Sequence, residues 1–235
     1  MKKTLVLSLG GSVLIPSLEE NRIGAYVPVL TKIAAAHRLF VVVGGGGEAR
    51  RFIAAARNLG ADDGTADEIG IAVTRLNARL LIAGLRGAVH PALALSQDEA
   101  IAKGESGKIV VMGGITPGQT TDAVSAVLAE RLGADLLINL TSVDGVYSAD
   151  PKTDPEAKRY DRLSPVDLLG IVRLDLLTAG ANSVMDMVAA NVVARSGVPL
   201  VVMDGRDPAN LEKAVFSGTF RGTVVDRENR KVLPL

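Results

Sequence analysis

Three glycine-rich turns, each directly after an apolar segment, are the first residues of this sequence that could do chemistry. They are Gly10-Gly11-Ser12, Gly44 to Gly47, and Gly113-Gly114. Glycine lets the backbone approach a ligand closely and point several N–H groups at it. A helix that begins after such a turn adds the partial positive charge of its N-terminus. Together the turns predict a site for phosphate or another anion, although none matches the Walker pattern or the dinucleotide fingerprint.

Arg50 follows the run of four glycines and is the candidate charge partner of that anion. With Arg51 it falls in the first turn of a helix expected over about 48–59. A cation at a helix N-terminus is unfavourable for stability alone, and a phosphate held between the amides and an arginine would resolve that conflict. The alternative is a solvated arginine without a role, which is our expectation for Arg51.

A polar segment after Gly113-Gly114 offers a second candidate site. It reads Thr116-Pro117-Gly118-Gln119-Thr120-Thr121-Asp122. Two threonines and an aspartate before an apolar periodic stretch are typical of a helix N-cap. The Pro-Gly turn and the polar side chains would also form a rigid cradle for a small polar ligand. One segment can serve both purposes.

The segment Thr141 to Pro151 is the third candidate. It combines the end of an apolar strand with an Asp144-Gly145 turn, Tyr147, and Asp150 before a proline. The pattern alone leaves two interpretations open, namely a surface turn with a half-buried tyrosine and a ligand-binding loop. His37 and His90 show no metal-ligand spacing, and we expect each to be a structural or surface histidine.

The elements that must position these residues alternate between short apolar strands and longer helices. Such alternation predicts a mostly parallel central sheet covered by helices on both faces, a three-layer α/β sandwich. Ligands of such sheets bind beyond the carboxyl ends of the strands, so all three glycine turns should lie at one edge. Strands are expected at 5–9, 39–43, 92–95 (a weaker one), 109–112, 135–140, 198–203 and 223–225, and helices at about 19–36, 48–59, 65–86, 121–132, from 165, 183–196 and 208–217.

Composition limits the possible functions. The chain has 235 residues with 26 Lys plus Arg against 26 Asp plus Glu, so its charge predicts neither nucleic-acid nor membrane-surface binding. It has no cysteine, which excludes disulfides, thiolate metal sites and thiol nucleophiles and fits a reducing cytoplasm. The first apolar segment is too short for a signal peptide, and no run reaches the roughly 20 residues of a membrane span. We expect a cytoplasmic protein.

Taken together, these motifs resemble the amino-acid-kinase family. The resemblance rests on the strand–Gly-Gly-Ser start, the Val-Val-Val-Gly-Gly-Gly segment, and Met112-Gly113-Gly114. Its most specific part pairs Thr116-Pro-Gly-x-Thr-Thr-Asp with Asp144-Gly-Val-Tyr-x-Ala-Asp-Pro. Within the family the chain is most similar to the UMP kinases, particularly the archaeal type. The similarity covers about residues 4–225, which implies one amino-acid-kinase domain over 1–235 with an acceptor-side lobe of about 1–140 and an ATP-side lobe of about 141–235.

This resemblance implies transfer of the γ-phosphate of ATP to UMP with Mg²⁺, without a nucleophilic side chain, in a homohexamer. Gly10, Gly11 and Arg50 would stabilise the transferred group, and no protein metal ligand is assigned. ATP would contact Gly11, Ser12, Gly46, Arg50, Thr141, Tyr147 and Asp150. UMP would contact Gly45, Asp67 (through its ribose), Ile115, Thr116, Pro117, Gly118, Gln119, Thr120 and Thr121.

Two positions depart from the family pattern. Many members carry a lysine two residues before the first glycine of the first turn, where this chain has Ser8. The cation that would stabilise the transition state is therefore unassigned. Gly47 stands where the family usually has a side chain.

Two alternatives remain open at this point. One is another kinase of the same fold, acting on isopentenyl phosphate or forming an acyl phosphate. The isopentenyl phosphate kinases carry a histidine in the glycine loop, and Gly44 to Gly47 contain none. The other is a storage protein for oxometallate clusters, which would need a cluster of histidines and acids.

Overall fold

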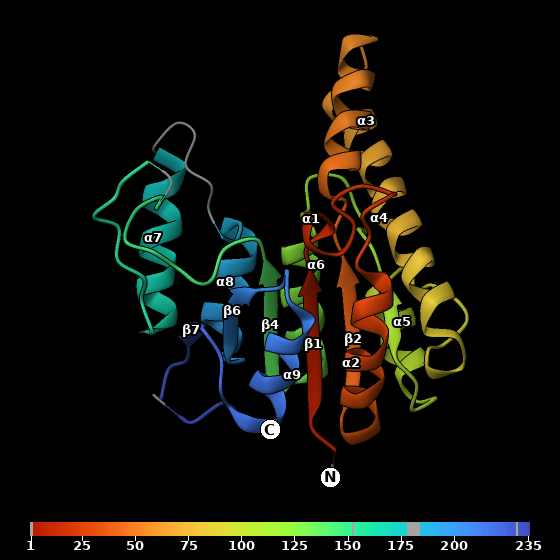
Figure 1. Ribbon diagram of the computed structural model, residues 1–235. Coiled ribbons are helices and arrows are strands. Elements are labelled where there is room, and N and C mark those ends of the chain that lie inside the picture. Colours follow the sequence, from red (N-terminus) through yellow and green to blue (C-terminus); the bar gives the residue numbers. More distant parts are fainter. Residues whose placement is uncertain (1, 152, 178–183, 229) are drawn as a thin grey trace.

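A single seven-stranded sheet forms the centre of the molecule (Figure 1). The computed structural model describes residues 2–151, 153–177, 184–228 and 230–235. The strand order is β3-β2-β1-β4-β6-β7-β5. The strands are β1 Thr4–Leu9, β2 Arg38–Val43, β3 Val110–Met112, β4 Leu136–Thr141, β5 Arg162–Leu163, β6 Leu200–Asp204 and β7 Gly222–Val225.

The pairing of the strands confirms the predicted mostly parallel sheet. β1 pairs in parallel with β2 and β4, β2 with β3, and β4 with β6. β7 runs antiparallel to β6, and β5 follows the direction of β7. Consequently β1, β2 and β3 end at the same edge, which brings the three glycine turns together as expected.

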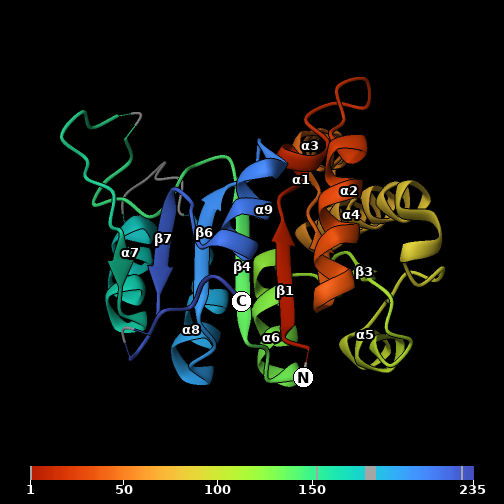
Figure 2. The same cartoon turned by 60° about the horizontal axis from the view of Figure 1, so that its bottom comes forward.

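Helices cover both faces of the sheet, so the predicted three-layer arrangement is confirmed (Figures 1 and 2). Successive strand residues point to opposite faces. Leu5 and Leu7 of β1 belong to the core of one face, and Val6 belongs to the core of the other. The first core is covered by α1 Gly11–Leu14, α2 Ile23–Ala36, α4 Asp63–Leu85 and α9 Pro208–Ser217, and the second by α5 Gln97–Gly104, α6 Thr121–Leu132, α7 Pro165–Leu177 and α8 Met187–Ser196.

Helix α3, Gly46–Asn58, packs along α4 and extends past the carboxyl edge of the sheet (Figure 1). A short 3₁₀ turn, η1 Arg86–Ala88, follows α4. The expected cap before α6 is confirmed, with Thr120 accepting from the Ala123 N–H, and Asp207 caps α9 by accepting from the Ala209 N–H. Among the described helices, none is both long and apolar enough to cross a membrane.

Some predicted elements were wrong. The strand expected at 92–95 is only an isolated bridge between Ala94 and Met112, because the chain bends at Pro91 and the Ala92 N–H donates to His90 Nδ1 across that bend. The helix expected from about 19 begins at Ile23. Three elements, α1, β5 and α5, were not predicted from the sequence. For α5 the signal was present, since Ser96 and Glu99 have capping-box spacing and Ser96 Oγ accepts from the Glu99 N–H. The beginning of the helix expected at 183 lies outside the described residues.

Candidate active site

The first two glycine turns lie in direct backbone contact. A Cβ on Gly11 would lie 2.5 Å from the Gly44 oxygen and 2.3 Å from the Gly46 nitrogen. Gly46 has a φ of +67°, which also favours glycine. These glycines are therefore required by packing, irrespective of any ligand. The same packing places the first turns of α1 and α3 side by side, where helical N–H groups lack intrahelical acceptors and can bind an anion.

One expected anion ligand is already used within the protein. The Gly10 N–H donates to the Leu140 oxygen at 3.0 Å. Gly10 therefore shapes the turn between β1 and α1, while the amides of Gly11 and Ser12, in the first turn of α1, face no such competition from the helix. The role of Gly10 in stabilising the transferred group stays a prediction, and it would not involve this amide.

A cavity of about 580 Å³ opens at the carboxyl ends of β1 and β4. Residues from both glycine turns, from the start of α6 and from β4 form its walls. Its lining comprises Gly10, Gly11, Ser12, Val13, Gly44, Gly45, Gly46, Arg50, Thr121, Asp122, Asn139, Leu140, Thr141, Ser142, Val143 and Val184.

A second cavity, of about 420 Å³, lies between α3, α4 and the loop before α6. It contains most of the residues predicted to bind UMP. Its lining comprises Gly45, Gly46, Ala49, Ile53, Asp67, Gly70, Ile71, Thr74, Gly114, Thr116, Gly118, Gln119, Thr120 and Thr121.

The two cavities share Gly45, Gly46 and Thr121 as lining residues. Each has the size of a small-molecule site. Two ligands bound in them would meet at the amino end of α3, where backbone N–H groups favour negative charge. The arrangement therefore suits transfer of an anionic group from one ligand to the other.

Side chains of helix α4 hold the loop of residues 113–120 by hydrogen bonds to its backbone. Asp67 Oδ2 accepts from the Gly118 N–H at 2.8 Å, and Thr74 Oγ1 accepts from the Gly114 N–H at 2.7 Å. Arg75 Nε donates to the Gly114 oxygen at 3.1 Å. Residues at this spacing share one face of a helix. Asp67 was predicted from the resemblance, whereas Arg75 was missed because its partners are backbone atoms 39 residues away.

Asp122 lines the larger cavity, and the negative charge of a second carboxylate, Asp186, acts on it. Ser8 Oγ donates to Asp122 Oδ1 at 2.7 Å. Asp186 Oδ1 accepts from the Val188 and Ala189 N–H groups at the start of α8, and its Oδ2 accepts from Thr120 Oγ1. The pKa of Asp122 is raised to about 6, because burial and the negative charge of Asp186 raise it by more than the Ser8 hydrogen bond lowers it. Sequence reasoning had treated Asp122 only as part of a cap and had missed Asp186.

These carboxylates fit a divalent cation that arrives with a nucleotide. Mg²⁺ in kinase sites is commonly held by one or two carboxylates together with substrate phosphates and water. Burial is the main cause of the raised pKa of Asp122 and the charge of Asp186 adds to it, so a cation beside the two carboxylates would stabilise their charged forms. Asp122 and Asp186 would thus hold Mg²⁺ beside the phosphates. In the described part of the chain, no group of three or more histidines and acids could hold a metal by itself.

The titration of Asp122 gives a stability prediction. Its pKa is raised from 3.8 to about 6 in the folded chain, so the protonated form favours folding, and this contribution is lost as pH rises from about 4 to about 6. Asp122→Asn removes this dependence. Without Mg²⁺, the free energy of unfolding of the wild type should fall between pH 4 and 6 by at most about 3 kcal/mol, and that of the variant should not show this fall. Urea unfolding at pH 4.5 and 7 measures it, and a difference that is constant with pH contradicts it.

Arg50 lies on the wall of the larger cavity, with its Nη2 3.4 Å from Ser12 Oγ. Its predicted place in the first helical turn was wrong, because α3 begins at Gly46 and Arg50 therefore falls in the second turn. The conflict with the helix N-terminus is accordingly weaker than expected. Arg51 instead pairs with Glu48 at 3.2 Å and is largely exposed.

Four predicted residues line neither cavity. The Ile115 oxygen accepts from Arg75 Nη2 at 3.3 Å, and Pro117 lies in the exposed loop. Tyr147 donates its hydroxyl to Asp144 Oδ1 at 2.7 Å. Tyr147 and Asp150 follow Thr141 to Val143 along the segment that leaves the larger cavity.

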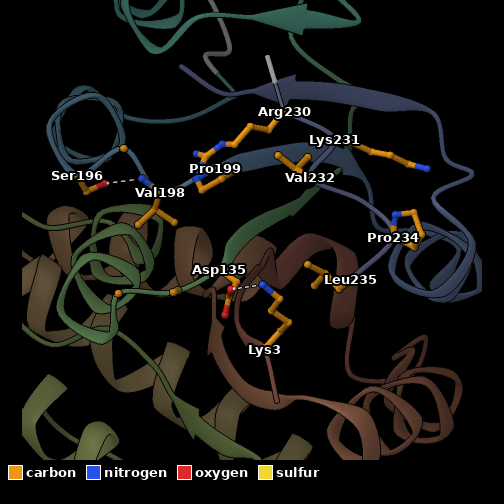
Figure 3. A pocket seen from close by; sticks show the side chains of 13 residues that line it. Lys3, Asp135, Ser196, Val198, Pro199, Arg230, Lys231, Val232, Pro234 and Leu235 are labelled. Carbon is orange, nitrogen blue, oxygen red and sulfur yellow. Dashed lines mark hydrogen bonds and ion pairs between the residues drawn. The ribbon is translucent and has the colours of Figure 1, made fainter. Parts of the chain in front are cut away.

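Another hollow, of about 510 Å³, lies at the opposite edge of the sheet (Figure 3). Lys3 points at Asp135 there, 2.9 Å away, and Arg230 pairs with Asp226 at 2.8 Å. Helices α6 and α8 end beside this hollow at Gly133 and Gly197, and helix C-termini favour nearby cations. Lys3 and Arg230 are therefore explained by partners within the protein.

This fold and this pair of adjoining cavities define the class: the chain belongs to the amino acid kinase family, which residues 3–204 match. It is 61% identical over 232 residues to the uridylate kinase of Methanoculleus marisnigri, covering 99% of each chain. It is 57% identical to the uridylate kinase of Methanospirillum hungatei, covering 99% of this chain and 98% of the relative. The crystal structure of uridylate kinase from Archaeoglobus fulgidus is similar with a TM-score of 0.85 and 46% identity, over 94% of this chain and 99% of that one.

Proposed function

We propose that this chain transfers the γ-phosphoryl group of ATP to UMP and releases UDP and ADP. The observation that carries the proposal is the meeting of the two cavities at Gly45, Gly46 and Thr121. Relatives named uridylate kinase at 57–61% identity, aligned over nearly the whole chain, indicate which nucleotide is the acceptor.

UMP occupies the smaller cavity in this proposal and ATP the larger one. Every lining residue of the smaller cavity precedes residue 122, whereas the larger cavity also uses residues from 139 onward. That difference supports an acceptor-side lobe of about 1–140 and an ATP-side lobe of about 141–235. Tyr147 and Asp150 would contact the adenine nucleotide as it extends from the larger cavity.

Catalysis then consists of positioning and charge stabilisation, as is usual for phosphoryl transfer. A phosphate oxygen of UMP forms the new P–O bond in line with the bond that breaks to the β-phosphate, and ADP leaves. Amides of the first turns of α1 and α3 and the Arg50 guanidinium stabilise the transferred group. Asp122 and Asp186 would hold Mg²⁺, which would supply positive charge beside the phosphates of ATP.

Asp67 is proposed to bind the ribose of UMP, which leads to a kinetic prediction. Asp67→Asn keeps an oxygen that can accept from the Gly118 N–H but removes the negative charge facing the sugar hydroxyls. The KM for UMP should rise roughly 10- to 100-fold, the scale of a hydrogen bond to a charged group. The KM for ATP should change less than about twofold in the same steady-state assay.

The matched control is Asp63→Asn, at the exposed start of the same helix, where Asp63 pairs with Arg57 at 2.9 Å. It should leave both KM values unchanged. If the KM for UMP rises equally in both variants, the proposed contact between Asp67 and UMP is wrong.

A substrate comparison tests the proposal as a whole. ADP release is coupled to NADH oxidation with UMP, CMP, isopentenyl phosphate and carbamate as acceptors. UMP should be the best acceptor by a wide margin in kcat/KM. A better rate with isopentenyl phosphate or carbamate would assign the chain to another kinase of the family. Bound oxometallate in the purified protein, without turnover, would support the storage alternative.

We further propose that the reaction serves pyrimidine nucleotide biosynthesis in the cytoplasm and that the chain works as a homohexamer. Support for self-association comes from an apolar row on the outside of the molecule. Leu18, Leu76 and Leu80 are 59%, 60% and 44% exposed. Leu18 and Leu80 also line a groove between α2 and α4. Light scattering in solution measures the mass, and a monomer at working concentration would contradict the hexamer.

A further inference from the structure

The donor side of the site is short of positive charge. Among the described residues that line the larger cavity, Arg50 is the cation, and the carboxyl group of Asp122 is on the same wall. Ser8, where many family members carry a lysine, is buried and bonded to Asp122. A triphosphate with several negative charges needs more compensation than Arg50 provides.

Asp144 lies directly after Val143 of the cavity wall and is shared by two arginines. Arg221 Nε contacts Asp144 Oδ2, and Arg159 Nη1 is 3.7 Å from the same oxygen. Tyr147 donates to the other oxygen, Oδ1. The segment after β4 runs toward β7 to reach these partners (Figure 1), and the Val146 N–H fixes it there by donating to Thr223 Oγ1 at 2.8 Å.

The two arginines differ in how well they are satisfied. The Arg221 side chain is 71% exposed, whereas that of Arg159 is 22% exposed. Arg159 Nη2 donates to Asp161 at 2.7 Å, but its Nε and Nη1 are buried without a hydrogen-bond partner in the described part of the chain. Unsatisfied buried donors are costly. A small movement of Asp144 toward Arg159 would satisfy Nη1 and release Arg221.

The other arginines described at this edge are held more firmly. Arg206 donates from Nε at 3.0 Å and from Nη2 at 2.5 Å to Asp204. Arg22 Nη1 donates to the Val13 oxygen at 2.7 Å. Arg221 differs from both, because its carboxylate partner has a second arginine within reach.

We propose that Arg221 binds the phosphate chain of the donor nucleotide. When the nucleotide binds, Asp144 exchanges Arg221 for Arg159, and the released guanidinium donates to phosphate oxygens. Arg221 thereby supplies positive charge that the chain lacks at Ser8. This inference rests on the proposed donor site but is independent of which acceptor is phosphorylated.

Calorimetric titration without an acceptor tests the contact. Arg221→Gln should weaken binding of Mg²⁺-ATP and Mg²⁺-ADP roughly 10- to 100-fold, as expected for lost charge-assisted hydrogen bonds, and should leave adenosine binding unchanged. Arg221→Lys should retain part of the affinity. The control is Arg131→Gln. Arg131 pairs with Asp98 on α5, and its replacement should not change the affinity for either nucleotide. ATP affinity of Arg221→Gln within twofold of the wild type overturns the proposal.

Two more variants test the exchange. Arg159→Met leaves Asp144 no second partner, so Arg221 stays paired and the affinity for ATP should fall. Asp144→Asn frees Arg221, so the affinity for ATP should be retained. If Arg221→Gln and Asp144→Asn weaken ATP and adenosine equally, Arg221 only anchors the loop and the inference is wrong. If the ATP results hold and UMP is not phosphorylated, the proposed acceptor fails while the role of Arg221 stands.

Discussion

Arg50→Ala is expected to lower kcat for UMP phosphorylation about 100-fold or more, the scale of losing one donor that stabilises charge in a transition state. Arg50 lies on the wall of the cavity assigned to ATP, close to the place where the two cavities meet. Its guanidinium can donate hydrogen bonds to the oxygens of the transferred phosphoryl group while negative charge spreads over them. The side chain is exposed, so the melting temperature should not change.

Arg51→Ala is the matched control, because it removes the same charge from the adjacent position. Arg51 pairs with Glu48 in an exposed i,i+3 contact, an interaction that contributes little. Its kcat should stay near that of the wild type. Arg50→Lys should fall between the two, since lysine keeps the charge without the planar fork. Wild-type turnover of Arg50→Ala at saturating ATP and UMP would exclude Arg50 from catalysis.

The position of the site could be predicted from the sequence because it depends on local patterns. Continuous apolar strands followed by glycines specify parallel strands, and parallel strands end at one edge. Gly10, Gly44 and Gly113 were thereby placed together without any knowledge of contacts. The substrates, in contrast, came from the resemblance, since a glycine turn does not identify the anion.

The charge pairs of the site could not be predicted, because they join distant parts of the chain. Ser8 meets Asp122 over 114 residues, and Thr120 meets Asp186 over 66. No periodicity or spacing relates such residues. The departure at Ser8 was visible in the sequence, but only the structure shows that its hydroxyl donates to the carboxyl group of Asp122.

The glycines also serve a purpose that their pattern does not reveal. The sequence predicted them as ligands of an anion, whereas Gly11 and Gly46 are needed first because their backbones touch. The two purposes are compatible, since close packing of the turns is what brings two helix N-termini to one point. A substitution at Gly11 or Gly46 would disturb the backbone packing and the anion site together. Substitutions of the side chains around these glycines therefore give the sharper tests.

Asp186→Asn is the second large effect that we expect. Asp186 Oδ1 caps α8 by accepting from the Val188 and Ala189 N–H groups. Its Oδ2 accepts from Thr120 Oγ1, at the end of the loop of residues 113–120. It therefore joins the ATP side of the molecule to the UMP side while adding charge beside Asp122. Asparagine is an equally good cap, so α8 should remain intact, but the charge is lost and the tie to Thr120 is altered.

The variant should lose turnover on the order of 100-fold, because small displacements of reacting groups are costly, and it should need more Mg²⁺ for half-maximal rate. Asp62→Asn is the control, since Asp62 caps α4 through the Thr65 N–H away from both cavities. Circular dichroism melting of both variants separates folding from catalysis. If Asp186→Asn keeps more than half of the wild-type kcat with an unchanged Mg²⁺ requirement, Asp186 is only a helix cap, and Asp122 alone must hold the cation.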